Sequence, residues 1–126
     1  MEDLAKELRQ KYGIETPIES IEKVIEKMGG SICVNEELTE CKMNSLSEGF
    51  VMTIPSKQYM VSSYGRFMMV RKLGLYMKYH WHPNDVKENS FADEVWASEF
   101  AMRFLVPAES LLKLLQDKWA NLNTSE

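Results

Sequence analysis

Apolar residues recur at helical spacing in several separate stretches of the chain. The first stretch predicts a helix from about Glu2 to Tyr12, with Gly13 ending it. The second opens with the capping box Thr16-Pro17-Ile18-Glu19 and stops at Gly29-Gly30. Its expected buried stripe comprises Ile18, Ile21, Val24, Ile25 and Met28. A longer stretch, capped by Ser62 or Ser63 and extending to His82, predicts a central helix in which Gly74 allows a neighbour to approach closely.

Two further helices are predicted after the central one. Pro83 ends the central stretch, and Ser90-Phe91-Ala92-Asp93 forms a second capping box that opens a helix extending to about Leu105. Its expected core residues are Ala92, Val95, Phe100, Ala101, Phe104 and Leu105. Pro107 then starts a last helix. The apolar residues of that last helix are Leu111, Leu112, Leu114, Leu115, Trp119 and Leu122.

Two short regions have the pattern of β-strands. Ser31 to Val34 follows Gly29-Gly30 and is mostly apolar, and residues 50–54 alternate, with Phe50, Met52 and Ile54 on one face. We expect a turn at 55–57 and a returning strand at 58–62, which would form a hairpin. Residues 35–47 are polar without periodicity and are expected to be a loop. The prediction is an α+β fold of about five helices packed on a small antiparallel sheet.

Length and composition indicate one soluble domain spanning residues 1–126. The chain is 44% hydrophobic and 27% charged, and no apolar run is long enough to span a bilayer. The N-terminus begins with acidic residues and has no apolar signal core, and the two cysteines do not make a disulfide framework. We therefore expect a cytoplasmic protein without membrane contact, whose oligomeric state the sequence does not indicate.

Charge is distributed unevenly along the chain. The net charge of -4 argues against general nucleic-acid binding, yet residues 49–84 contain five basic residues and no acidic ones. The five are Lys57, Arg66, Arg71, Lys72 and Lys78. They could attract an acidic partner, or they could pair with Asp93, Glu94 or Glu99.

Two segments carry a family resemblance. Residues 66–77, RFMMVRKLGLYM, and residues 96–107, WASEFAMRFLVP, resemble the two active-site helices of the ImmA/IrrE family of zinc metallopeptidases. The resemblance implies a zincin-like core whose central helix carries a His-Glu-x-x-His motif. It also implies that two histidines and a glutamate bind zinc while the adjacent glutamate is the general base. The corresponding positions here are Arg71, Leu75, Trp96 and Lys72.

None of these four residues suits the implied chemistry. A guanidinium has no lone pair to offer zinc, and Leu75 and Trp96 have no ligand atom. A solvated lysine is already protonated at neutral pH, so Lys72 is not a general base. We therefore predict a pseudoprotease without zinc or another cofactor. Arg71 could pair with Glu94 or Glu99 in place of the metal, and Trp96 could plug the former pocket or anchor a partner.

The resemblance also implies a protein partner. Active family members cleave helix-turn-helix repressors of phages or mobile elements, so we expect a non-cleaving regulator that binds such a repressor through Arg71, Lys72 and Trp96. In the family, an edge strand beside the metal-binding helix holds the substrate peptide. Four residues would contribute to such an edge, unless they are ordinary sheet residues: Val51, Thr53, Tyr59 and Val61.

Two alternatives remain open from the sequence. His80 and His82 form an H-x-H pair that could act with Glu99 as a non-standard metal site in an active metallopeptidase. The chain could also be a structural or interaction module unrelated to repressors.

Overall fold

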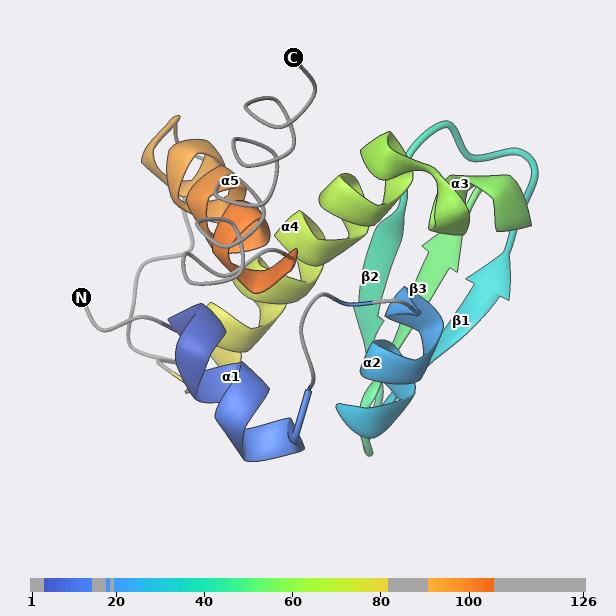
Figure 1. Cartoon of the computed structure of the whole chain (residues 1–126). Coiled ribbons are helices and arrows are strands. Elements are labelled where there is room, and N and C mark those ends of the chain that lie inside the picture. The colour runs from blue at the N-terminus through green and yellow to red at the C-terminus, as the bar shows by residue number, and fades with distance from the viewer. Residues whose placement is uncertain (1–3, 15–17, 19, 82–90, 106–126) are drawn as a thin grey trace, which may run out of the picture.

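The protein has an α+β fold, as predicted. A computed structural model describes residues 4–14, 18, 20–81 and 91–105. The elements in chain order are α1 (Leu4–Tyr12), α2 (Ile21–Lys27), β1 (Gly30–Val34), β2 (Lys42–Ser45), β3 (Phe50–Ile54), α3 (Lys57–Val61), α4 (Ser63–Trp81) and α5 (Phe91–Leu105). Helix α4 crosses the middle of the molecule, with the sheet on one side and α5 on the other (Figure 1).

The described strands form one mixed sheet, so the prediction of an antiparallel sheet is wrong for one of its two pairings. The order is β1-β3-β2, with β1 parallel and β2 antiparallel to β3. Strand β2 lies within the segment predicted to be a loop. Of its four residues only Met43 is even partly buried, so the strand has no alternating hydrophobic pattern to reveal it.

Residues 57–61 form helix α3 instead of a returning strand. The Ser56 side chain accepts a hydrogen bond from the Tyr59 backbone N–H at 3.2 Å, which is an N-cap contact. The apparent hairpin was wrong because the alternation of apolar and polar residues is too short here to distinguish a strand from a single helical turn. Tyr59 and Val61 are consequently not sheet residues.

Capping residues set the other helix boundaries. Gly13 has φ of 60° directly after α1, as expected for a glycine that ends a helix. Helix α2 begins later than predicted, because Ser20 is its N-cap and Ile18 is buried outside the helix. The capping box at Thr16-Pro17 lies outside the described residues. Ser62 caps α4, with its Oγ accepting from the Gly65 backbone N–H at 2.9 Å.

The core lies on both sides of α4. Toward the sheet, its apolar residues join the inward face of β3 in one buried cluster; these residues are Met69, Val70, Leu73, Met77, Phe50, Met52 and Ile54. Toward α5, the buried residues are Ala97, Phe100, Ala101 and Phe104, spaced as one face of a helix. The prediction that Ala92 and Val95 are core residues is wrong, because both are exposed; Leu105 is partly buried.

Gly74 sets the distance between α4 and α5. A Cβ at this position would lie 2.3 Å from Cδ1 of Phe100, which is closer than real contacts allow. The prediction of a close helix approach at Gly74 is confirmed. Among the described residues, no helix combines the length and apolar character needed to cross a membrane. The predicted final helix and the segment 82–90 lie outside the described residues.

Replacing Gly74 by Ala should destabilise the protein by about 1–3 kcal/mol, because the added methyl group must displace the Phe100 ring. Urea unfolding measures this change, and a double-mutant cycle with F100L should show that the two substitutions together cost less than their sum. Helix propensity alone would stabilise G74A by about 1 kcal/mol, and that result would contradict the proposed close contact.

Candidate functional site

A groove of about 480 Å³ lies between the edge strand β2 and helix α4. Its lining residues are Met43, Ser45, Lys72, Leu75, Tyr76, Tyr79 and His80. The two β2 residues are two positions apart and share one face of the strand, while the α4 residues fall at helical spacing along one stripe. The groove therefore follows α4 for about two turns and has walls of side chains from both elements.

Of the four positions at which the resemblance implies zinc ligands and a general base, two, Lys72 and Leu75, line this groove. Lys72 is exposed and Leu75 is partly buried. Arg71 and Trp96 are not among the lining residues, and both make contacts between α4 and α5. The structure thus separates the four positions into a groove pair and a helix-interface pair.

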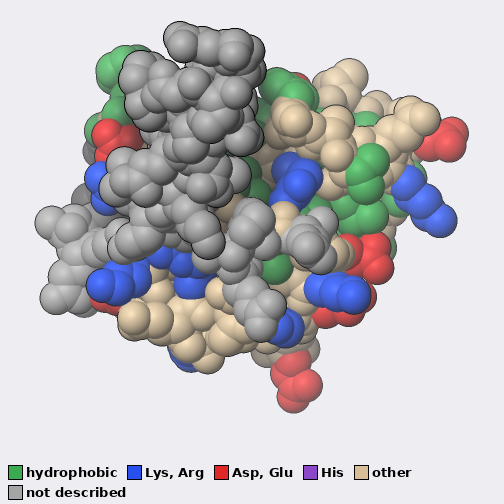
Figure 2. All heavy atoms as spheres, viewed as in Figure 1, with side chains coloured by type: hydrophobic (Ala, Val, Ile, Leu, Met, Phe, Trp, Pro, Cys, Tyr) green, Lys and Arg blue, Asp and Glu red, His purple; other side chains and the backbone are tan. Residues whose placement is uncertain are grey.

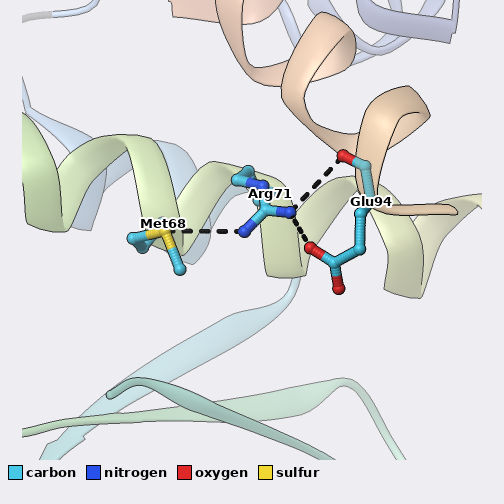
Figure 3. Close-up of polar contacts among 3 residues, drawn as sticks. All are labelled: Met68, Arg71 and Glu94. Carbon is cyan, nitrogen blue, oxygen red and sulfur yellow. Dashed lines mark hydrogen bonds and ion pairs between the residues drawn. The ribbon is translucent and has the colours of Figure 1, made fainter. Parts of the chain in front are cut away.

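Arg71 joins α4 to the first turn of α5 (Figure 3). Its guanidinium forms an ion pair with the Glu94 carboxylate and donates to the Glu94 backbone carbonyl at 3.4 Å. A further N–H contacts Sδ of Met68 at 3.5 Å. The Arg71 side chain is only 15% exposed, whereas that of Glu94 is 54% exposed. The predicted pairing of Arg71 is confirmed for Glu94.

Trp96 packs within the same helix interface. Its ring stacks on Phe100 with centroids 5.4 Å apart, and the Lys78 ammonium lies 4.9 Å from the indole centroid. Lys78 also pairs with Asp93 at 3.4 Å, and Asp93 accepts from the Tyr79 hydroxyl at 2.5 Å. Trp96 therefore contacts both helices and is not a lining residue of the groove, and its interpretation as a plug of a former pocket stays a prediction.

Some of the basic residues between positions 49 and 84 are neutralised by acidic residues of α5. Arg71 and Lys78 pair with Glu94 and Asp93, and Arg66 donates to the Ile18 carbonyl. On the face shown in Figure 2, Lys and Arg side chains are scattered among Asp and Glu side chains. The interpretation in which the cations pair with the acidic residues of α5 is thus confirmed for these two ion pairs.

The predicted peptide-binding edge is wrong in its residues. Thr53 pairs with Cys33 on one side and with Lys42 on the other, so β3 is the central strand and has no free edge. The same holds for Val51. The strand whose outer edge faces away from β3 beside α4 is β2, which the sequence did not reveal.

A polar cluster connects the β1–β2 segment to α3 and α4. The Glu40 carboxylate accepts hydrogen bonds from Tyr59 at 3.1 Å and from Tyr64 at 2.7 Å. Hydrogen bonding to Glu40 raises the pKa of the Tyr64 hydroxyl. Tyr59, a predicted binding residue, therefore connects α3 to the segment between β1 and β2. Sequence reasoning missed the cluster because Glu40 lies in a segment without periodicity.

Cys41 belongs to the same cluster and is 2% exposed. Burial raises the pKa of its thiol and outweighs the opposing effects of a hydrogen bond with Tyr59 and of the Lys72 charge. Burial and the contact with Cys41 likewise raise the pKa of Tyr59. Cys41 is therefore held as a neutral thiol and does not suit the role of a nucleophile.

Within the described part of the chain, no three His, Cys, Asp or Glu side chains come close enough to hold a metal ion. His80 stacks on Tyr76 with ring centroids 5.8 Å apart. His82, its partner in the alternative metal site, lies outside the described residues, so that alternative remains a prediction.

The E94Q substitution should destabilise the protein by about 1 kcal/mol, because it removes the charge that faces Arg71 at a half-exposed position. Chemical unfolding measures the change, and the difference should shrink in high salt. E99Q on the same helix is the matched control, since Glu99 is exposed and its substitution should change stability by less than about 0.5 kcal/mol. Equal effects of the two substitutions would argue against a stabilising ion pair.

The two thiols should differ in reactivity toward a disulfide reagent at pH 8. Cys33 is exposed and should react rapidly, whereas Cys41 should react only after the protein opens, because its thiol is buried and its pKa is raised. A C33S variant isolates Cys41, and urea should restore its reaction. Rapid labelling of Cys41 in the folded C33S protein would contradict the arrangement described.

Comparison of the sequence with protein-family models found no match, and comparisons of the chain with curated proteins and with solved structures also found none.

Proposed function

We propose that this protein is a non-catalytic, metallopeptidase-like protein that binds a protein partner without cleaving it. The observation that carries the proposal is the use made of the four positions at which the resemblance implies zinc ligands and a general base. Arg71 forms an ion pair with Glu94, and the Trp96 ring on α5 contacts the Lys78 ammonium on α4. Lys72 and Leu75 face a groove and offer a cation and an apolar side chain.

The groove supports partner binding. An extended segment placed along α4 would lie beside β2, whose outer edge carries backbone groups not paired within the described sheet. Following the resemblance, the proposed partner is a helix-turn-helix repressor, and the proposed setting is the cytoplasm of a cell that carries a phage or mobile element. The resemblance also suggests that such a repressor is encoded beside this protein.

The proposal predicts that the protein is folded and has a zinc-to-protein ratio near zero when it is purified without a chelator or a metal-affinity tag. Elemental mass spectrometry measures the ratio. With the repressor partner, a complex should form and the partner should stay intact on a gel, including after zinc is added. A zinc ratio near one, or cleavage of the partner, would instead favour the metallopeptidase with a non-standard site.

A variant with restored ligands provides the matched control. R71H, K72E, L75H and W96E together would place the implied two histidines, glutamate ligand and general base at the four positions. If these positions correspond to a former metal site, the folded variant should bind about one zinc ion where the native protein binds none. A folded variant that fails to bind zinc would refute the correspondence on which the proposal depends.

A further inference from the structure

The groove between β2 and α4 is asymmetric in charge. The lining residues that the structure describes include one lysine and one histidine but no carboxylate. Lys72 lies at one end of the α4 stripe and His80 at the other, separated by eight residues. At the helical rise this separation is about 12 Å, which matches about four residues of an extended chain.

Among the described residues, Lys72 differs from Arg71 and Lys78 of α4 in forming no ion pair, and from Arg66 in donating to no backbone carbonyl. Arg71 and Lys78 pair with acidic residues of α5, and Arg66 donates to a backbone carbonyl. Lys72 is exposed, and its ammonium acts on Cys41, which is neutral because burial raises the pKa of the thiol. An ammonium that has no anionic partner in the described part of the chain, in a groove whose described lining has no carboxylate, is suited to a carboxylate supplied by a ligand.

The other lining residues indicate what surrounds that carboxylate. Met43 and Leu75 are partly buried apolar side chains from opposite walls. The Tyr76 ring stacks on His80 and lies tilted against Phe50. Such a lining favours a segment that alternates apolar and acidic side chains. It does not favour nucleic acid, since a phosphate backbone requires several cations in a row and the whole chain has a net charge of -4.

We infer that the groove between β2 and α4 binds an acidic, extended peptide segment of the partner, with a carboxylate of that segment placed against Lys72. This inference depends on the proposed function and specifies its partner: the segment recognised should be acidic and about four residues long. Lys72 thus becomes the residue that selects the ligand by charge.

The test is fluorescence anisotropy of the full-length protein with three labelled hexapeptides. One peptide alternates Glu with Val, the second has Gln in place of Glu, and the third has Lys in place of Glu. The native protein should bind the Glu peptide about fivefold more tightly than the Gln peptide, and it should bind the Lys peptide most weakly. Added salt should reduce the differences in affinity among the three peptides.

Charge reversal at Lys72 makes the test specific to this residue. K72E should weaken binding of the Glu peptide about tenfold and strengthen binding of the Lys peptide, a reversal that a purely structural role of Lys72 would not produce. K57E is the matched control, because Lys57 is an exposed lysine on α3 that does not line the groove. It alters the net charge equally and should leave the peptide order unchanged.

Four outcomes would overturn the inference, and they differ in what they imply for the proposed function. Equal binding of the Glu and Gln peptides, unchanged by K72E, would refute the acidic preference and leave a peptide-binding groove. If a six-nucleotide single strand binds more tightly than the Glu peptide, the ligand of the groove is a nucleic acid and not a peptide. If no peptide binds while the intact repressor does, the groove is not the docking site; if neither binds, the proposed function fails as well.

Discussion

The close contact between Gly74 of α4 and the Phe100 ring of α5 is the constraint on which the rest of the structure depends. The ring occupies the space that a side chain at position 74 would take, so the two helices approach closely and bury a common face. On its other side, α4 packs against Phe50 and its neighbours on β3. One helix therefore serves as the middle layer, and its position fixes where β2 and α5 lie relative to each other (Figure 1).

Polar contacts complete the interface that this packing begins. The first turn of α5 is exposed where Ala92 and Val95 lie, so hydrophobic burial contributes little there. Instead Glu94 and Asp93 bind Arg71 and Lys78 of α4. In the metallopeptidase frame implied by the resemblance, the metal would connect the same two helices. An ion pair at a half-exposed position is weaker than metal ligation, but it requires no cofactor.

Much of this fold follows from periodicity, and the parts that do not have identifiable causes. The helical pattern placed α1, α4 and α5 within a few residues, and alternation identified β3, because each buries a regular face. Strand β2 could not be predicted, since an edge strand with a single partly buried residue leaves no pattern. Without β2, the sequence predicts that Thr53 lies at the edge of the sheet. In the structure β2 flanks Thr53, which is therefore in the central strand.

The sequence predicts the α4 side of the groove in part, but not its β2 side. Lys72 and Leu75 were singled out as substituted positions, and both line the groove. The residues of β2 on the opposite wall, Met43 and Ser45, could not be predicted, because β2 has no hydrophobic pattern that would place it beside α4. The ion pair of Arg71 could be anticipated as a choice between two glutamates, but only the geometry of the first turn of α5 selects Glu94.

The arrangement of α4 separates the residues that hold the fold from those that line the groove. Its core face, which includes Leu73 and Met77, lies on a different side from the stripe that begins at Lys72 and Leu75. Substitutions at the exposed Lys72 therefore alter charge at the surface without opening a cavity in the core, whereas Tyr76 also packs against Phe50 and belongs to both sides. A helix buried on two sides and open on a third keeps its place through the packed sides, which leaves exposed positions on the open side free to vary.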